Sequence, residues 1–457
     1  MNSEKWRQRV MITCFAVLIL AMGIVFIRWG VARVFIKHLH QENAITQLVF
    51  HDDPNIGMRE NLSKEKKIDW VKEYPFSQMK QPSSYMRAVD KLHYYKNKIF
   101  RKGKTNKRRT DIEEWTTKHF WQYPTLVELG RQYENIIGWN IWNPSLKVAK
   151  FPDGSLTFIH SQNSQKERIE SVSELADFAK SKGVKFFFVQ APSKVDAFGD
   201  KTVNGKIDFS NQNADELLMG LREHGIDVLD LRSSFHEIAP TSEDYHRLFY
   251  RTDHHWKPQS ALFAADLVAQ RLEIVGIPMD RQAYDSANYT IDTYPSFFLG
   301  SQGKKVTLAK TKPDDFDIVK PDFPVNLHVE MPSLDVDATG DFDLLLDPCQ
   351  IERKDYYNLN PYAFYGRGDM PLLRIVNLNQ RETGKKVLMI RDSFSDTLVP
   401  YLALGCRQII TLDLRHFTGS VQKFIEQEKP DVVVVMYTID YSDKINWKDH
   451  KDKFDFR

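Results

Sequence analysis

Residues 386–404, KVLMIRDSFSDTLVPYLAL, decide the fold, because an apolar run passes through a short polar turn into a second apolar segment. The run Lys386 to Ile390 predicts a strand, and Phe394 to Leu404 predicts a helix. The strand lacks alternation of polar and apolar residues, which is typical of strands buried on both faces in a parallel sheet. Ser393 therefore stands in the turn at the carboxyl end of a buried strand.

The same strand and helix patterns recur on both sides of this stretch. Gly183 and Gly225 each end a helical pattern directly before an apolar run. These patterns predict a three-layer α/β domain over residues 136–457 with a parallel sheet of about five strands. The other expected strands are 184–189, 226–231, 408–412 and 431–436, and the other expected helices are 167–181, 217–224, 258–275 and 421–427.

A Pro- and Asp-rich stretch at about 280–375 interrupts the alternation of helices and strands. It contains short alternating runs such as Val325 to Val329. Such runs predict strands with one buried face. We interpret this stretch as an insertion of extra strands and loops.

An uncharged apolar run covers Val10 to Ile27, which is about the minimum length for crossing a bilayer. Trp6 and Trp29 stand where interfacial aromatic residues are expected. We predict a transmembrane anchor at 10–29, preceded by a short cytoplasmic tail at 1–9. The remainder is then extracytoplasmic, because an N-terminal apolar segment of this kind usually acts as an export signal.

A cleaved signal peptide is the alternative, with the small residues at 30–32 as its cleavage site. The juxtamembrane region, 30–135, is polar and basic, most densely at 101–109. Charge runs of this kind are usually solvated loops. The more specific alternative is that this region contacts anionic lipid headgroups or an anionic wall polymer.

Charge and cysteine content exclude some classes of protein. The formal net charge is +2, which implies no global attraction to nucleic acid. Three cysteines are too few for a disulfide framework, and Cys14 lies in the apolar N-terminal run. Cys349 and Cys406 could form a disulfide, but nothing in the surrounding sequence requires one.

The block Thr252 to Trp256 supplies the groups that a serine nucleophile needs. His255 is the candidate base, and Asp253 is the carboxylate that would fix its tautomer. Ser393, beside the N-terminus of a helix, is the candidate nucleophile, since free N–H groups there favour an oxyanion. The alternative is structural: Asp392 and Ser393 are good helix caps, and the histidine of the block can cap the helix starting near Pro258.

In an extended segment successive side chains point to opposite sides, so His254 should point away from Asp253 and His255. We therefore expect His254 to have a packing or hydrogen-bonding role. A metal site at 253–255 with His246 nearby matches no standard zinc spacing, so we expect neither metal nor cofactor. Several further residues lie at predicted strand ends. Lys194, Arg415, Tyr437 and Asp392 are the candidates for substrate or oxyanion contacts, and Trp256 and Asp413, which we expect to pair with Arg415, are candidates for structural support.

The segment Tyr250 to Trp256 resembles the signature of the bacterial DHHW family. Further matching segments are 192–194, 298–301, 392–394 and 413–415, in the same order and spacing. That family is similar to the periplasmic alginate O-acetylation proteins, which have an SGNH-hydrolase-like fold. The resemblance implies the triad Ser393, His255 and Asp253, acting in acetyl transfer or deacetylation on a polysaccharide. It also implies a membrane-bound O-acyltransferase as partner.

Two departures from ordinary SGNH hydrolases stand out. Arg391 replaces the glycine of their Gly-Asp-Ser block, and no side-chain oxyanion donor can be assigned beyond the backbone N–H of Ser393. We therefore predict a membrane-anchored, extracytoplasmic serine O-acetyltransferase acting on a cell-surface or exported polysaccharide. The alternatives are a carbohydrate acetylesterase with the same triad and a non-catalytic factor for glycan binding or assembly.

Overall fold

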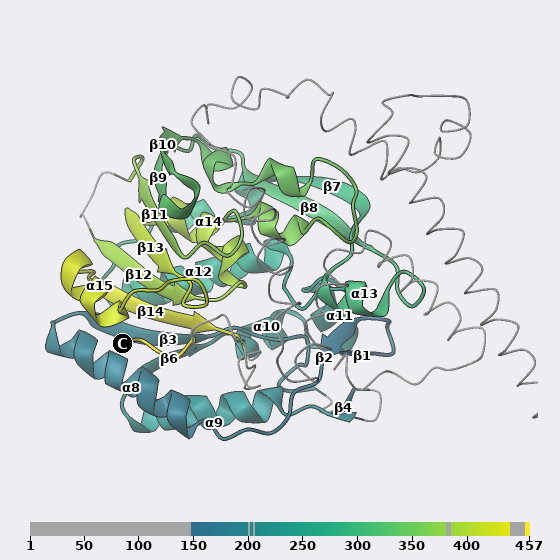
Figure 1. Ribbon diagram of the computed structural model, residues 1–457, viewed down its shortest axis with the longest axis horizontal. Helices are drawn as coiled ribbons and strands as arrows, with labels where there is room; N and C mark the ends of the chain where they lie inside the picture. The colour runs from purple at the N-terminus through teal and green to yellow at the C-terminus, as the bar shows by residue number, and fades with distance from the viewer. Residues whose placement is uncertain (1–147, 200–201, 204–205, 381–384, 439–452) are drawn as a thin grey trace, which may run out of the picture. The chain divides into compact units, whose positions relative to one another are not determined.

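The computed structural model describes residues 148–199, 202–203, 206–380, 385–438 and 453–457 (Figure 1). The predicted tail at 1–9, the anchor at 10–29 and the basic region at 30–135 lie outside these residues. Among the described residues, no helix has the length and apolar composition needed to cross a bilayer.

An eight-stranded mixed sheet forms the centre of the domain, in the order β10-β9-β11-β13-β12-β14-β3-β6. The five strands from β13 to β6 are parallel to one another. They are the five that the sequence predicts. Their bounds are β3 Lys185–Gln190, β6 Asp227–Asp230, β12 Lys386–Arg391, β13 Gln408–Leu412 and β14 Val432–Tyr437.

The insertion, which the sequence predicts to carry extra strands, adds three antiparallel strands at one edge of the parallel strands, so the whole sheet is mixed. Strand β11 (Leu372–Asn377) pairs with β13, and β9 (Leu327–Met331) and β10 (Val336–Gly340) follow it. Their burial alternates, as in Leu327, Val329 and Met331 of β9, so one face is covered and the other is more exposed. The insertion therefore extends the core sheet.

Helices cover both faces of the sheet, which gives the predicted three layers (Figure 1). On one face, α8 (Lys166–Ser181), α9 (Ser210–Glu223) and α15 (Val421–Glu428) bury their apolar sides. Leu388 of β12 and Val433 of β14 lie in the same apolar cluster as these helices. Helices α12 (Pro258–Ile274) and α14 (Ser395–Gly405) pack against each other outside that cluster.

Helix α14 is buried along its whole length, so its apolar sequence has no solvent-facing stripe. Such a helix sits at a defined place between the sheet and its neighbours. The turn that precedes it, with Ser393, is consequently held from both ends, by central strand β12 and by a buried helix.

Most of the remaining elements are short. A long hairpin of β7 and β8 belongs to the insertion. The bounds are β1 Val148–Lys150, β2 Leu156–Phe158, β4 Thr202–Val203, β5 Lys206–Ile207, β7 Tyr289–Phe298, β8 Asp314–Pro321, α10 Leu231–Ile238, α11 Ser242–Arg247 and α13 Ser301–Val306; the 3₁₀ turns are η2 Arg281–Tyr284, η3 Ser286–Asn288, η4 Pro332–Leu334, η5 Phe342–Leu345, η6 Pro348–Gln350 and η7 Pro361–Phe364.

The two cysteines within the described residues do not pair. Cys349 is exposed and Cys406 is buried, and both are free thiols. Core packing therefore stabilises this part of the chain without a cross-link.

Leu388→Ala is expected to destabilise the domain by about 2–5 kcal/mol, because Leu388 is fully buried in the central strand and its loss leaves a cavity. Urea denaturation measures the change. Ile291→Ala, at a side chain that is 56% exposed, is the control and should change the free energy of unfolding by roughly 0.5 kcal/mol or less. Equal effects of the two substitutions would contradict this placement of the core.

Candidate active site

Ser393 lies in the turn between the end of β12 at Arg391 and the start of α14 at Ser395. The residue at the N-cap of α14 is Phe394, and no side chain caps the helix. The structural alternative of Ser393 as a helix cap is therefore wrong. Its Oγ lies 2.8 Å from Nε2 of His255.

His255 in turn is held by Asp253. Nδ1 of the imidazole lies 2.5 Å from Oδ1 of Asp253, and the backbone N–H of His255 donates to the same oxygen at 3.1 Å. Both residues are buried, whereas Ser393 is half-buried. The three groups thus form a continuous chain from a buried carboxylate to a partly accessible hydroxyl.

The insertion holds this carboxylate in place. The backbone N–H of Ser301, at the start of α13, donates to Oδ2 of Asp253 at 2.5 Å. Asp314, at the start of β8, accepts from the backbone N–H groups of Arg251 and Thr252, each at 2.8 Å. Two segments of the insertion thereby fix the loop that carries the acid and the base.

Gly300 allows the close approach of these two segments. A Cβ atom at this position would lie 2.2 Å from Cβ of Asp253 and 2.6 Å from its Cα. The backbone N–H of Gly300 donates to Oγ1 of Thr252 at 2.9 Å. Any side chain at residue 300 would therefore displace the carboxylate loop.

Asp392 shapes the nucleophile turn. Its Oδ1 accepts from the backbone N–H of Phe394 at 3.1 Å, and its Oδ2 accepts from the backbone N–H of Thr438 at 2.8 Å. It therefore ties the end of β12 to the end of β14 and does not itself reach the reacting oxygen. The backbone N–H of Ser393 donates to no acceptor in the described part of the chain, so it remains available to an oxyanion.

Tyr362, in the 3₁₀ turn η7, is a site residue that the sequence reasoning missed. Its ring stacks on the imidazole of His255 with centroids 3.8 Å apart and an angle of 11° between the planes. Its hydroxyl donates to the carbonyls of Ser393 and Phe394 at 3.0 and 3.1 Å. Burial raises the pKa of Tyr362 well above its ordinary value, so the phenol stays a donor. No local sequence pattern marks this residue, because it lies in an insertion loop.

The aromatic neighbours of the block give it further support. Nε1 of Trp256 donates to the carbonyl of Phe394 at 3.0 Å, which is the supporting role expected of this residue. His254 does not turn away from the site: its ring lies 3.8 Å from that of His255, and its Nδ1 lies 3.1 Å from Oγ of Ser301. The block bends instead of running extended, so simple alternation fails there.

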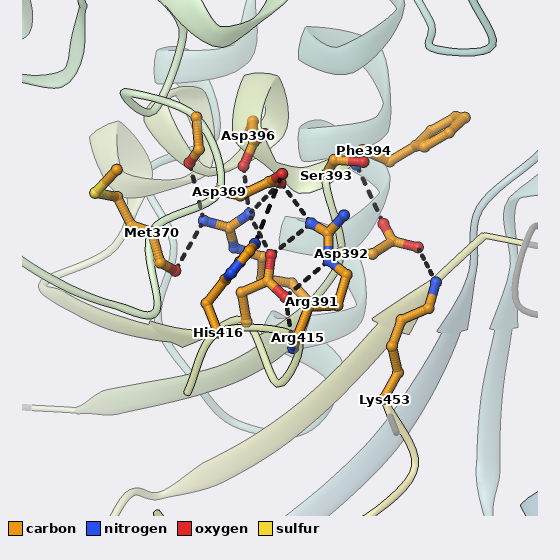
Figure 2. A network of polar contacts seen from close by, with 12 residues as sticks. Asp369, Met370, Arg391, Asp392, Ser393, Phe394, Asp396, Arg415, His416 and Lys453 are labelled. Carbon is orange, nitrogen blue, oxygen red and sulfur yellow. Dashed lines mark hydrogen bonds and ion pairs between the residues drawn. The ribbon is translucent and has the colours of Figure 1, made fainter. Parts of the chain in front are cut away.

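Arg391, which replaces the usual glycine, is buried in a network of carboxylates (Figure 2). Its guanidinium pairs with Asp396 in the first turn of α14 and lies 3.5 Å from Asp413. Its Nη2 also donates to the backbone carbonyls of residues 368 and 370. Through these contacts Arg391 stabilises the turn that carries Ser393.

Arg415 belongs to the same network. Its guanidinium pairs with Asp413, as expected, and with Asp369. These pairs occupy Nε and Nη2 of Arg415, so its role in the described structure is to hold this edge of the sheet. A substrate contact of Arg415 stays a prediction.

Two other expected substrate contacts are also engaged elsewhere. Lys194 is buried, and its Nζ donates to the carbonyls of Leu156 and Arg251 at 2.7 and 3.1 Å. Burial lowers the pKa of Lys194 to about 7, against the opposing charges of Asp314, Asp253 and Asp153. Tyr437 donates its hydroxyl to the carbonyl of Lys453 and packs in the core. In the described structure Lys194 is thus a buried donor to backbone carbonyls, and Tyr437 is a core residue.

Among the described residues, two groups of side chains lie close enough together to share a metal ion. One is Asp253, His254 and His255, and the other is Asp369 with Asp413 and His416. In the first group both ring nitrogens of His255 and both oxygens of Asp253 already have hydrogen-bond partners. In the second, Asp369 and Asp413 pair with arginine. These contacts favour hydrogen bonding over metal binding, and the expected absence of a metal stays a prediction.

The arrangement suits nucleophilic acyl transfer. Residues 151–296 match the family model described as the SGNH hydrolase-like domain of the acetyltransferase AlgX. This match includes the block with Asp253 and His255, while Ser393 lies beyond it. It confirms the resemblance to the SGNH-like acetylation proteins that the sequence motifs indicate. No curated protein matches the chain.

Solved structures support the same fold. A structure of Bacillus cereus PatB1 with a sulfonyl adduct is similar with a TM-score of 0.55 and 18% identity, covering 68% of this chain and 98% of that one. A DHHW family protein from Eubacterium siraeum is similar with a TM-score of 0.50 and 16% identity, covering 65% and 91%. At these identities the likeness establishes the SGNH-like fold, here with a mixed sheet.

Gly300→Ala is expected to destabilise the domain by about 1–3 kcal/mol, because the new methyl group overlaps Asp253. Urea denaturation measures the change. The matched control is Gly340→Ala in β10, where the nearest atoms are side-chain carbons of Leu344 at 3.2 Å that can move aside. A Gly300 variant as stable as the Gly340 variant would rule out the close approach.

The stability of the domain should depend on the ionisation of Asp253. Burial raises the pKa of this carboxyl, but His254, His255 and the N–H of Ser301 together hold it well below its ordinary value. Because the folded pKa lies below the unfolded value of about 3.9, the carboxylate stabilises the fold above about pH 4. That contribution is lost as the pH falls through the folded pKa.

The free-energy gap between the native chain and Asp253→Asn should therefore be largest near pH 7 and shrink as the pH falls below about 4. Urea denaturation of both proteins between pH 7 and pH 3 measures the gap. A gap that stays constant over this range would show that the charge of Asp253 does not stabilise the fold.

Proposed function

We propose that this chain is a membrane-anchored, extracytoplasmic serine O-acetyltransferase that acts on a cell-surface or exported polysaccharide. The observation that carries the proposal is the unbroken contact from Asp253 through His255 to Oγ of Ser393. Nucleophile, base and orienting carboxylate lie within hydrogen-bond reach, which is the geometry that activates a serine hydroxyl. The matching family model is that of an acetyltransferase.

In the first half of the reaction, Nε2 of His255 takes the proton of Ser393 as Oγ attacks the acyl carbonyl. The new C–O bond gives a tetrahedral intermediate whose oxyanion can accept from the backbone N–H of Ser393. His255 then returns the proton to the leaving group. Asp253 keeps Nδ1 protonated and stabilises the imidazolium.

In the second half, a sugar hydroxyl attacks the acyl group on Ser393, and His255 takes the hydroxyl proton. The C–O bond to Ser393 breaks, and the same proton returns to Oγ. If water attacks instead, the products are free acid and enzyme, so a carbohydrate acetylesterase would use the same residues.

Location and partners follow from the apolar segment at 10–29 and from the resemblance to envelope acetylation proteins. We place the domain outside the cytoplasm, tethered at the membrane. There it receives acyl groups from a membrane-bound O-acyltransferase that passes them across the bilayer. A non-catalytic role in glycan binding would be indicated by side chains of Ser393 and His255 that lie too far apart to interact. Oγ of Ser393 and Nε2 of His255 lie 2.8 Å apart, which disfavours that role.

Ser393→Ala should abolish release of the phenol from an aryl acetate, because the acyl acceptor of the first step is removed. Asp253→Asn should lower kcat by roughly 10⁴, because the wrong imidazole tautomer is stabilised. Intact-mass spectrometry of the native chain during turnover should show an acetyl adduct on Ser393.

The matched control is Ser181→Ala, at an exposed serine whose Oγ donates to a carbonyl at the end of α8. This variant should keep full activity. Aryl acetate cleavage that survives Ser393→Ala unchanged, with no adduct on residue 393, would rule out the triad.

A further inference from the structure

The stack of Tyr362 on His255 places an aromatic face directly over the base of the triad. The ring centroids lie 3.8 Å apart and the planes differ by 11°, so the two rings overlap almost face to face. Two neutral aromatic rings prefer offset or edge-on arrangements with centroids about 4.5–7 Å apart, because both π faces carry partial negative charge. A cation, by contrast, is attracted to a π face at short range. The geometry of this pair therefore suits a charged imidazole better than a neutral one.

The imidazole of His255 becomes a cation in each half of the acyl-transfer reaction. It gains its positive charge when Nε2 takes the proton of Ser393 and again when it takes the proton of the acceptor hydroxyl. Asp253 compensates this charge at the edge of the ring, through Nδ1. The face of the ring is left to another partner, and Tyr362 lies there.

Burial strengthens the contact between the two rings. Tyr362 is 2% exposed and His255 is 7% exposed, so little solvent screens the new charge. The attraction between a cation and a π face is larger where water is excluded. Burial also raises the pKa of Tyr362 well above its ordinary value, so the phenol stays neutral. The contact therefore acts through the π electrons of the ring and not through a phenolate charge.

The hydroxyl of the same side chain reaches the turn that carries the nucleophile. It lies 3.0 Å from the carbonyl oxygen of Ser393 and 3.1 Å from that of Phe394. The ring is itself held in the 3₁₀ turn η7 and by an edge-on contact with Tyr250. One rigid side chain thus touches both the base and the backbone of the nucleophile, and its two ends have separable effects.

The other groups around the imidazole stay in place when Tyr362 is changed. Among the described residues, the block itself and the nucleophile turn supply the remaining neighbours of His255, which are Asp253, His254, Ser393 and Phe394. Of these, Asp253 and His254 can carry a charge near neutral pH. Because neither is altered by a substitution at residue 362, a change in the pH dependence can be assigned to the ring of Tyr362.

We propose that Tyr362 is a positioning residue of the acyl-transfer reaction: its ring stabilises the imidazolium form of His255, and its hydroxyl holds the turn of Ser393 against Nε2. The inference rests on the proposed function, because the imidazolium forms when His255 acts as the base. Tyr362 itself gives and takes no proton. The proton still passes from Ser393 to His255 and on to the leaving group.

Tyr362→Phe and fluorinated phenylalanines at the same position separate the two roles. Fluorine withdraws electron density from the π face while the ring keeps nearly the same shape, so folding is preserved. The measured quantity is the pH dependence of kcat/KM for p-nitrophenyl acetate, with the full-length protein. Its acidic limb reports the protonation of the essential base in the free enzyme.

Tyr362→Phe should leave the midpoint of the acidic limb in place and lower kcat by roughly two- to tenfold, because only the hydroxyl contact is lost. Pentafluorophenylalanine at residue 362 should then move the midpoint by roughly half to one and a half pH units to lower pH. The direction follows because a less stable imidazolium loses its proton at lower pH. Difluorophenylalanine should give an intermediate midpoint.

Tyr365 is the matched control, since it is fully buried and lies three residues further along the chain. In the described structure its ring packs on Phe316 and Tyr401, and its hydroxyl bonds to the backbone of β8. The same fluorinated residue at position 365 should leave the midpoint where Tyr365→Phe has it.

Equal midpoints for Tyr362→Phe and for its pentafluoro analogue would overturn the role of the ring, and so would an equal shift from residue 365. An unchanged kcat in Tyr362→Phe would overturn the role of the hydroxyl. If the native chain cleaves the ester without an acetyl adduct on Ser393, the proposed function itself is overturned. The adduct therefore distinguishes a failure of this inference from a failure of the proposed function.

Discussion

The buried carboxylate of Asp253 is the group on which the rest of the site depends. It accepts from Nδ1 and the backbone N–H of His255 and from the backbone N–H of Ser301, so its charge is compensated on both oxygens. A buried carboxylate with fewer partners would be protonated or displaced. The same carboxylate orients His255 toward Ser393. The hydrogen bonds that compensate the buried charge of Asp253 therefore also arrange the reacting groups.

The insertion has a larger part in the site than its irregular sequence suggests. Its chain supplies Gly300 and Ser301 against the carboxylate, Asp314 against the loop backbone, and Tyr362 against the imidazole. It also contributes three strands to the central sheet. Packing into the core sheet makes these loops rigid, and rigid loops can hold side chains within the few tenths of an ångström that a reaction requires. The insertion is thus part of the domain core and of the site.

The turn carrying Ser393 is supported by the buried side chain of Arg391. The buried guanidinium of Arg391 pairs with Asp396, as Figure 2 shows, and also lies 3.5 Å from Asp413. Removing one member of such a network would leave the others buried and uncompensated. On the other side of the turn, Asp392 accepts from Thr438, and Tyr362 donates to the carbonyl of Ser393.

Local patterns in the sequence were enough to determine the five parallel strands, the helices that cover them and the candidates Asp253, His255 and Ser393. Continuous apolar runs and glycine breaks report burial and chain direction, and the ends of parallel strands meet at one edge. Only the tertiary structure decided the contacts made across long separations: the mixed edge of the sheet, the stacking of Tyr362 on His255, and the burial of Lys194 with Gln302. These depend on where an irregular insertion packs, and neither periodicity nor composition encodes that position. The same reason explains His254, which a bend in the chain places beside His255 although alternation predicts the opposite direction.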